Sequence, residues 1–536
     1  MNEFKKEALE YHEAKPRGKI KVVPTKPHST SHELSLAYSP GVAYPCLEIA
    51  DNPDNAYRYT SKGNLVAVIS NGTAVLGLGD IGAVASKPVM EGKGLLLKTF
   101  ADIDVFDIEV DTDNIDDFVK TVCNIAPTFG GINLEDIKAP ECFEIERRIS
   151  EATNIPVMHD DQHGTAIISG AALLNSVELQ EKELSKIKVV VAGAGASAIA
   201  CASHYVALGV KIENIVMCDS KGIMTSKRQK AGELNEYKAK FVTDCDEGTL
   251  ADALVGADVL LGLSKGGLVT GEMISKMADR PIIFALANPT PEIMPDEVKS
   301  IRDDAIIATG RSDFPNQVNN VLGFPYIFRG ALDVRARDIT QGMKMAATKA
   351  LAALAKEPVP DYIAHAYSGE SMQYGPNYII PKPFDRRVLI WEASDVAEAA
   401  VLEGIAAISA EDFDKQRYRE SLEARLGMSY SVMRGVFNQV KGRKKKIVFP
   451  EGDNEKVIRA AAQCVEQEIC VPILLGNSES IRSKMESLNI EFGCEIINPR
   501  YDDRRIGNYD LKLLDNRSRK GMTKIDAQRL LKSRPY

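Results

Sequence analysis

Short apolar runs recur along the chain, and most of them are unbroken rather than alternating with polar residues. The runs in "KIKVVVAG", "NIVMCDS", "ADVLLGLS", "PIIFALANPT" and "DAIIATGRS" have the length of a β-strand and are bounded by Gly, Asp, Asn or Ser. Unbroken runs are typical of strands buried on both faces, as in a parallel sheet covered by crossover helices. The pattern therefore predicts an α/β chain with a doubly wound parallel sheet of Rossmann type in its middle part.

The regions on either side of this predicted sheet have a different pattern of apolar and charged residues. Residues 1–162 combine shorter apolar runs, such as "NLVAVIS" and "DVFDIEV", with turns rich in Pro and Gly, which predicts a mixed α/β domain. Five positive charges lie between Lys441 and Lys446, which we interpret as a solvated linker or the entry to a strand. About 90 residues follow, which is small for an α/β domain, so we expect a partial domain there. We place the domains at residues 1–162, 163–428 and 429–536.

One loop carries the pattern of a dinucleotide-binding site. It follows the strand "KVVV" and opens an apolar helix with the spacing G-x-G-x-x-A; its residues are Gly193, Ala194, Gly195, Ala196, Ser197 and Ala198. In this pattern the first Gly makes a tight turn, the second lets the backbone approach a pyrophosphate, and the Ala lets helix and strand pack closely. The next strand ends in Asp219, which would bind an adenosine ribose and favour NAD. Residues that could instead hold the 2′-phosphate of NADP follow, so the spacing alone leaves both nucleotides open; they are Ser220, Lys221, Lys227 and Arg228.

Charge, hydropathy and cysteine usage exclude several classes of protein. A net charge of -9 argues against nucleic acid as the main partner, because no basic excess exists to neutralise phosphates. The segment from Val189 to Val210 has no charged residue, yet its glycines and serines favour a strand, turn and helix over a membrane span. The nine cysteines are scattered without a C-x-x-C pair, which is typical of a reducing cytosol. We therefore predict a cytoplasmic protein without a structural zinc site.

The stretch "NIPVMHDDQHGTA" raises the question of a metal site. His159 and His163 have the spacing of the zinc motif H-E-x-x-H, but that motif requires both histidines on one helix. A strand-like run precedes His159, and Gly164 follows the second histidine at once. Zinc hydrolysis is therefore disfavoured.

Two acidic pairs favour a harder metal. Asp160 and Asp161 in this stretch, and Glu135 and Asp136 in "GGINLEDIKAPE", each follow a short apolar strand. A single pair of this kind is more often a helix cap or an exposed turn. Two pairs on neighbouring strands of one sheet would lie side by side, and carboxylate oxygens without a thiolate suit Mg²⁺ or Mn²⁺.

Eight blocks of sequence occur in one order between about residues 10 and 425. They are "AYSPGVA", "VLGLGDIGA", "PVMEGKGLLLKTFADID", "INLEDI", "HDDQHGTA", "VVAGAGASA", "FALANPTPE" and "GRSDFPNQVNNVLGFPYIFRGALD". Together they resemble the malic enzymes, in their bacterial hybrid form. The segment from "KKIVFPEGDNEKVIRAA" onward resembles the start of a phosphate acetyltransferase domain, which the hybrid enzymes carry at their C-terminus.

The resemblance implies oxidative decarboxylation of (S)-malate to pyruvate and CO₂ with reduction of NADP, and decarboxylation of oxaloacetate as well. It implies that Lys93 removes the proton of the 2-hydroxyl, for which its pKa must be lowered. Tyr38 would return a proton to C3 of the enolate. The implied ligands of Mn²⁺ or Mg²⁺ are Glu135, Asp136 and Asp161, with the C1 carboxylate and 2-oxygen of malate completing the shell.

The family also implies supporting residues around the substrate. Asp160 would orient Lys93 or a metal ligand. Three asparagines would bind the substrate carboxylate and the ribose or amide of the nicotinamide; they are Asn288, Asn319 and Asn320. Many malic enzymes carry an arginine two residues before "LGLGD" that clamps malate, whereas this chain reads "GTAVLGLGD". Carboxylate binding is therefore expected to depend more on the metal and the asparagines.

The resemblance leaves some properties as expectations and two rival functions open. Hybrid malic enzymes mostly use NADP, so we predict NADP, with NAD as the alternative. We expect a homo-oligomer that binds malate, no acetyl transfer by the partial last domain, and regulation by acetyl-CoA only in a full-length form. One rival is a metal-independent NAD(P) dehydrogenase of a small acid, which leaves the acidic pairs unexplained. The other is a weakly catalytic acetyl-CoA sensor, against which the intact Tyr38, Lys93 and acidic residues speak.

Overall fold

The computed structural model divides the chain into two compact units, Met1–Leu422 and Glu423–Tyr536. The structure describes residues 2–75, 78–360, 363, 367, 372–426, 445–466, 469–487, 490, 492–498, 503–517 and 521–531. Most of the basic run between Lys441 and Lys446 lies outside the described residues, as do two residues of the "VLGLGD" block. The domain boundaries near residues 162 and 428 are not decided by this division and stay predictions.

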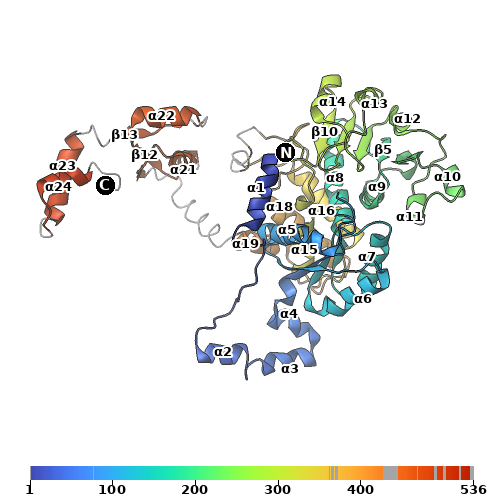
Figure 1. Cartoon of the computed structure of the whole chain (residues 1–536), viewed down its shortest axis with the longest axis horizontal. Helices are drawn as coiled ribbons and strands as arrows, with labels where there is room; N and C mark the ends of the chain where they lie inside the picture. The colour runs from blue at the N-terminus through green and yellow to red at the C-terminus, as the bar shows by residue number, and fades with distance from the viewer. Residues whose placement is uncertain are drawn as a thin grey trace. The chain divides into compact units, whose positions relative to one another are not determined.

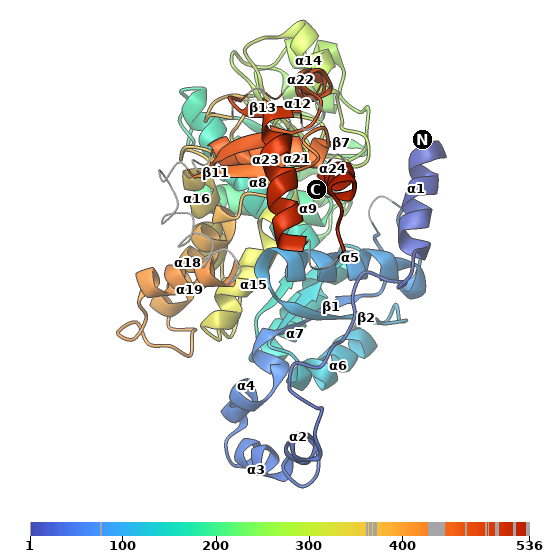
Figure 2. The ribbon, with the colours of Figure 1, turned by 90° about the vertical axis from the view of Figure 1, so that its left-hand side faces the viewer.

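A sheet of four parallel strands, in the order β2-β1-β3-β4, lies in the first unit. Its strands are β1 (Leu65–Ser70), β2 (Asp104–Glu109), β3 (Gly131–Leu134) and β4 (Val157–His159). The connecting helices are α5 (Ala83–Ala101), α6 (Ile115–Ile125), the 3-10 turn η3 (Ala126–Thr128) and α7 (Glu141–Ala152). Helices α6 and α7 pack on one face and α5 lies on the other (Figure 2). Every residue of β1 and β3 is buried, which explains their unbroken apolar runs.

Short helices precede this sheet. They are α1 (Asn2–Glu13), α2 (Ser31–Ala37), α3 (Ala43–Asp51), η1 (Pro53–Asn55), α4 (Ala56–Tyr59) and η2 (Ser61–Asn64). Figures 1 and 2 show α2 and α3 projecting away from the sheet, and we call residues 31–59 the N-terminal arm. None of the residues in α2, α3 and α4 is buried, and Leu36, Tyr44 and Leu47 are 61%, 72% and 68% exposed. Isolated helices this short are marginal in water, so the arm lacks packing that would stabilise it.

The second sheet has six strands in the order β10-β9-β8-β5-β6-β7, and all except β7 are parallel. They are β5 (Val189–Ala192), β6 (Ile215–Asp219), β7 (Gly222–Ile223), β8 (Val259–Gly262), β9 (Ile282–Ala285) and β10 (Ile306–Thr309). The intervening helices are α9 (Ala196–Leu208), η4 (Ile212–Asn214), α10 (Ser226–Lys230), α11 (Glu236–Ala239), α12 (Leu250–Leu254), α13 (Gly271–Ser275) and α14 (Pro295–Ile301). The winding reverses between β6 and β8 on either side of β5, and ligands of such sheets bind at the carboxyl ends of strands there.

These observations confirm the predicted α/β class with a Rossmann-type sheet. The charge-free segment forms β5 and α9, a strand, turn and helix as predicted. Among the residues that the structure describes, no helix is long and apolar enough to span a bilayer.

Helix α8 (Asp160–Leu179) runs from the end of β4 and packs against α9 and α16. The remaining elements of this unit are η5 (Asn320–Leu322), α15 (Phe324–Asp333), α16 (Gln341–Leu354), α18 (Arg387–Leu402) and α19 (Lys415–Arg425). The sequence argument against a helix around His163 is wrong, because α8 begins at Asp160 and continues through Gly164. A Cβ on Gly164 would lie 2.2 Å from Asp160 Oδ1 and 3.1 Å from Asn320 Cγ, so glycine leaves room for these side chains. Tertiary packing thus outweighs its helix-propensity cost of about 1 kcal/mol.

The second unit contains a parallel sheet of three strands in the order β11-β12-β13. Its elements are β11 (Lys446–Phe449), α21 (Glu455–Glu466), β12 (Val471–Leu475), α22 (Ser478–Ser487), β13 (Glu495–Ile497), α23 (Asp503–Arg517) and α24 (Lys524–Leu531). Ala461, Leu474 and Ile481 form a small buried core between the sheet and its helices. The last part of the chain is therefore an α/β segment, as its strand signals predicted.

Candidate active site

Three carboxylates meet where β3 and β4 end. Glu135 and Asp136 follow β3 directly, and Asp161 lies in the first turn of α8. Because β3 and β4 are parallel neighbours, their carboxyl ends share one edge, and the ligand oxygens of the three side chains lie within 4.8 Å of one another. Within the described ranges this is the single group of three such residues placed to hold an ion. An all-oxygen set of this kind suits Mg²⁺ or Mn²⁺.

The electrostatics of the cluster also fit a divalent cation. Burial raises the pKa of Glu135 well above its usual range; the charge of Lys93 opposes this, and the carboxylates of Asp161 and Asp160 raise it further. A cation between the carboxylates would relieve this repulsion. Asp136 has a φ of 53°, in the left-handed region that is rare for residues other than glycine, and its N–H donates to Asp161 Oδ2 over 2.9 Å. This hydrogen bond ties the ends of the two strands together.

Lys93 on α5 points into the same cluster. Its side chain is 12% exposed, and its Nζ donates to the Asp160 carboxylate and lies 2.9 Å from Glu135 Oε1. The ammonium also lies 4.5 Å from the ring centroid of Phe324. The expected lowering of the Lys93 pKa depends on a bound metal and nicotinamide and stays a prediction. Burial lowers the pKa of Lys93, but the charges of Asp160, Glu135 and Asp161 together raise it above its ordinary value.

Asp160 links Lys93 to the asparagine segment. The carboxylate is fully buried and accepts from Lys93 and, over 3.3 Å, from Asn320 Nδ2. Asn320 Oδ1 in turn accepts from Thr165 Oγ1 over 3.0 Å. Asp160 therefore lies where it can orient Lys93, and Asn320 fixes the orientation of Asp160.

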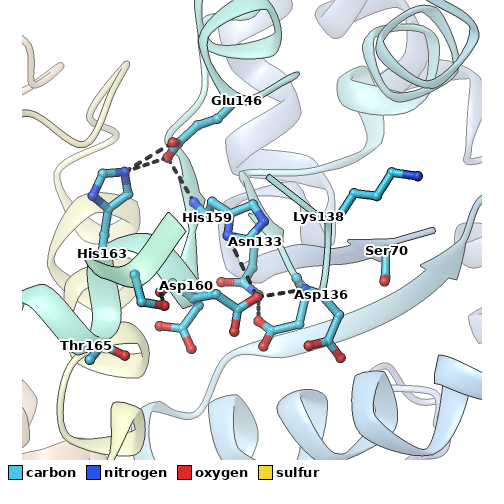
Figure 3. Close-up of polar contacts among 12 residues, drawn as sticks. Ser70, Asn133, Asp136, Lys138, Glu146, His159, Asp160, His163 and Thr165 are labelled. Atoms are coloured by element: carbon cyan, nitrogen blue, oxygen red, sulfur yellow. Dashed lines mark hydrogen bonds and ion pairs between the residues drawn. The ribbon is translucent and has the colours of Figure 1, made fainter. Parts of the chain in front are cut away.

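Glu146 on α7 contacts both His159 and His163, which the sequence did not indicate. Its carboxylate accepts from the backbone N–H of His159 over 2.9 Å and lies 2.9 Å from His163 Nε2 (Figure 3). Burial would raise the pKa of Glu146, but the charge and hydrogen bond of His163 and the charge of Lys344 lower it to about 2. The two histidines have different partners: His159 is fully buried with its Nδ1 3.9 Å from Asp161 Oδ2, whereas His163 is held by Glu146. The rejection of a two-histidine zinc site stays a prediction.

The remaining predicted site residues lie in three other segments of the chain. Asn288 follows β9 in an exposed turn near Gly310, at the carboxyl edge of the second sheet. Asn319 caps η5, and its Oδ1 accepts from the N–H of Val321 over 3.0 Å. Tyr38 follows α2 in the N-terminal arm and is 77% exposed, so the structure does not bring it to Lys93 within the chain.

The dinucleotide loop has the geometry that its pattern predicts. Gly193 has a φ of 130°, and its N–H donates to the carbonyl of Cys218 over 2.9 Å. A Cβ on Gly193 would lie 2.4 Å from the carbonyl oxygen of Leu263, whereas a Cβ on Gly195 would meet no atom within 4 Å. The space over Gly195 is therefore open for a ligand. Ala198 is buried at the base of α9, where helix and strand pack closely.

Two further contacts organise this edge. Ser197 Oγ donates to the backbone carbonyl of Asp161 over 2.6 Å, which joins the nucleotide loop to the carboxylate cluster. Glu292 is fully buried and accepts from the N–H groups of Ser264 and Ala287 over 2.9 and 3.1 Å, which holds the loops after β8 and β9. Ser197 lies 36 positions from Asp161 and Glu292 lies 28 positions from Ser264, so no local pattern could have found these two contacts.

Asp219 ends β6 at the predicted place. Arg228 binds it with both guanidinium branches, over 2.9 and 2.8 Å, and the Asp219 side chain is 13% exposed. Burial would raise the pKa of Asp219, but the hydrogen bonds from Arg228 lower it. The carboxylate is therefore charged and fixed where the adenosine ribose of a dinucleotide is expected.

A dinucleotide loop joined to a buried carboxylate cluster and a lysine fits a nucleotide-dependent oxidoreductase, in which the three carboxylates could hold a divalent cation. Comparison with known families agrees with this class. Residues 17–150 match the malic enzyme N-terminal domain, residues 162–363 the malic enzyme NAD binding domain, and residues 431–536 the phosphate acetyl/butaryl transferase family.

Curated relatives match over nearly the whole chain. An NADP-dependent malic enzyme of Rhizobium meliloti is 51% identical over 528 residues, which cover 98% of this chain and 69% of that protein. An NADP-dependent malic enzyme of Escherichia coli is 50% identical over 100% of this chain and 70% of its own length. The chain belongs to the malic enzyme family, in the form that carries a C-terminal phosphate acetyltransferase-like domain.

Solved structures agree in fold. The malic enzyme from Pyrococcus horikoshii has a TM-score of 0.72 and 43% identity, covering 81% of this chain and 98% of that one. The malic enzyme from Entamoeba histolytica has a TM-score of 0.72 and 36% identity, over 82% and 88% of the two chains.

Proposed function

We propose that this chain oxidises (S)-malate with NADP and releases pyruvate and CO₂, with Mn²⁺ or Mg²⁺ held by three carboxylates. The observation that carries the proposal is the meeting of Glu135, Asp136, Asp161 and Lys93 at one sheet edge, joined to the nucleotide loop through Ser197. The names of close relatives support malate and NADP. Decarboxylation of added oxaloacetate by the same site is part of the proposal.

Lys93 is the proposed base for the 2-hydroxyl of malate. A divalent cation held by Glu135 and Asp161 would neutralise two of the three carboxylates that raise the pKa of Lys93. The amine could then release its proton and accept one from the substrate. Asp160 then holds the ammonium that forms. When bound, the metal ion supplies a positive charge that polarises the 2-oxygen and draws electron density as CO₂ leaves. Asn320, tied to Asp160, is proposed to contact the substrate beside it.

NADP is the proposed nucleotide, bound by the loop from Gly193 to Ala198 with its ribose near Asp219. Asn288 and Asn319 are proposed to contact the nicotinamide half or the substrate carboxylate, since both lie at the carboxyl edge of the second sheet or just beyond it. An NAD-dependent malic enzyme of Rhizobium meliloti is also 50% identical to this chain, so overall identity does not separate the two nucleotides.

We infer that a second copy of the chain supplies Tyr38 as the acid that protonates C3. The arm that carries Tyr38 exposes large apolar side chains and has no buried residue in its helices, which a partner subunit would cover. Mixing inactive Tyr38→Phe and Lys93→Ala proteins then restores up to about a quarter of the wild-type activity, because half of randomly mixed dimers contain one intact site. If Tyr38 and Lys93 of one chain serve the same site, mixing the two inactive proteins restores no activity.

The reaction is tested by following nucleotide reduction with (S)-malate, NADP or NAD, with and without Mn²⁺, while pyruvate is assayed. We expect metal-dependent reduction with one pyruvate for each reduced nucleotide. Asp136→Asn is expected to abolish it, and Asp113→Asn, which removes an exposed carboxylate outside the cluster, to leave it unchanged. Reduction without pyruvate would instead identify a simple dehydrogenase. Absence of reduction together with acetyl-CoA binding would identify a sensor.

A further inference from the structure

The carboxylate of Glu233 lies between two cations near the end of β6. Its Oε2 accepts from Lys221 Nζ and from Arg228 Nε, each over 3.2 Å. The N–H of Glu233 donates to the carbonyl of Arg228 over 3.1 Å, which places the carboxylate beside the guanidinium. One carboxylate oxygen thus occupies an anion position formed by donors of two different side chains.

In this position the guanidinium of Arg228 is held in place, whereas the carboxylate of Glu233 can move. Arg228 is 9% exposed and holds Asp219 with both branches, and it also donates to the carbonyls of Gly222 and Ile223 over 3.3 and 3.1 Å. Glu233 is 37% exposed. Its carboxylate can therefore leave by side-chain rotation, while the guanidinium stays in place.

We propose that Glu233 is an internal competitor for the 2′-phosphate of NADP, and that this phosphate takes the place of the Glu233 carboxylate between Lys221 and Arg228 when NADP binds. The inference rests on the proposed function and adds the residues that set its nucleotide preference. Asp219 lies where the adenosine ribose is expected, so a phosphate on the 2′-oxygen falls next to these two cations. A phosphate monoester carries about -1.5 to -2 charges against one for the carboxylate, so it displaces Glu233, whereas the neutral 2′-hydroxyl of NAD does not.

The nearby Lys227 provides a matched comparison. It lies next to Arg228 in the sequence but pairs with Glu247 over 3.1 Å, and no hydrogen bond of Arg228 or Lys221 in the described chain reaches that pair. Lys227 was one of the residues that the sequence left open for the 2′-phosphate. The structure assigns that position to Lys221 and Arg228 instead.

The test is calorimetric titration of the full chain with 2′,5′-ADP and with 5′-ADP, without malate or metal. Glu233→Gln is expected to tighten 2′,5′-ADP about two- to five-fold, the range of an exposed ion pair, and to leave 5′-ADP unchanged. Lys221→Ala is expected to weaken 2′,5′-ADP by a similar factor, again without effect on 5′-ADP. Glu247→Gln, the matched control, is expected to change neither affinity.

Three results would overturn the inference. They are an unchanged or weaker affinity of Glu233→Gln for 2′,5′-ADP, an equal gain for both nucleotides, and an equal gain in Glu247→Gln. Malate-dependent reduction is measured separately on the same proteins. If the wild-type chain binds both nucleotides as expected but reduces neither NADP nor NAD with malate, the proposed reaction fails while the assignment of Glu233 stands.

Discussion

At Lys93, the charges that raise its pKa are the same charges that hold it in place. Because Asp160 and Glu135 are buried, they leave the amine little freedom to turn away from the cluster. A lysine held this way can act as a base once part of the surrounding charge is neutralised, and it contributes to stability in the meantime.

Lys93→Ala is expected to lower kcat by about 10²- to 10⁴-fold, the usual contribution of a general base, and to lower the free energy of unfolding because Asp160 loses its partner. Steady-state kinetics and denaturant unfolding measure the two effects. Lys87→Ala is the control, since Lys87 lies on the same helix, is 47% exposed and pairs with Asp107 outside the cluster. Equal losses of activity in both variants would contradict the assignment of Lys93.

His204 is expected to make the stability of the protein sensitive to acid. It is 3% exposed and packed against Thr348 and Gln341, and burial lowers its pKa from 6.5 to about 4. The unfolded chain therefore binds a proton between these pH values that the folded chain does not, so stability falls as pH drops from about 6.5 toward 4, by up to about 3 kcal/mol. Denaturant unfolding at pH 7 and pH 5 measures the loss.

His204→Gln is expected to reduce this pH dependence, even if it lowers stability at pH 7. His28→Gln, at an exposed position, serves as the control and is expected to keep the wild-type dependence. The same dependence in all three proteins would show that His204 is not the group responsible.

At the residue scale, the sequence predicted the acidic cluster and missed its surroundings. Glu135, Asp136 and Asp161 could be found because each follows an apolar strand, and strand ends of one parallel sheet share an edge. The charge state of Lys93 could not, because Asp160 lies 67 positions away and its effect depends on distance and burial. Glu146 was missed for the same reason, since its partners His159 and His163 lie 13 and 17 positions further along the chain.

At the element scale, the two glycines of the dinucleotide loop have separable roles. Gly193→Ala places a methyl group against the carbonyl of Leu263 at a positive φ, so we expect a loss of about 2 kcal/mol or more in unfolding free energy. In Gly195→Ala the added methyl group meets no protein atom within 4 Å. The free energy of unfolding is therefore expected to stay within about 0.5 kcal/mol of the wild type, while dinucleotide binding weakens. Thermal unfolding and calorimetric titration with NADP separate the two effects. Unimpaired NADP binding by Gly195→Ala would contradict the placement of the pyrophosphate.

The strands were predicted more reliably than the helix that links the two sheets. Unbroken apolar runs are sufficient to identify β5, β8 and β9, because burial on both faces leaves no alternation. Helix α8 was obscured by Gly164, whose helix-breaking tendency is a local property. The reason glycine is required there, the side chains of Asp160 and Asn320, is visible only in the folded chain.

At the scale of the whole molecule, the first compact unit contains every residue assigned to the proposed reaction. An NADP-dependent malic enzyme of Halomonas elongata is 57% identical over 407 residues, which cover 76% of this chain and 96% of that protein. A chain of residues 1–426 keeps α19, whose Leu422 is buried and whose Lys415 pairs with Asp395 over 2.7 Å. We expect it to fold and to retain malate-dependent reduction within about two-fold, since domains with their own core fold independently.

Cutting the chain at residue 410 instead removes α19 and is expected to lower the melting temperature of the remainder. Differential scanning calorimetry and the malate assay compare the two shortened chains with the full one. Loss of activity by the well-folded 1–426 chain would show that residues 427–536 contribute to catalysis.

The hydrogen bond from Ser197 to the carbonyl of Asp161 has a thermodynamic consequence. If bound NADP changes the affinity of the carboxylate cluster for Mn²⁺ by some factor, bound Mn²⁺ must change the affinity of the chain for NADP by the same factor. We expect this factor to exceed one and to shrink in Ser197→Ala, as measured by titrating each ligand with and without the other. An unchanged factor in the variant would exclude this contact as the link. A factor above one would mean that each of the two proposed ligands binds more tightly once the other is in place, before malate arrives.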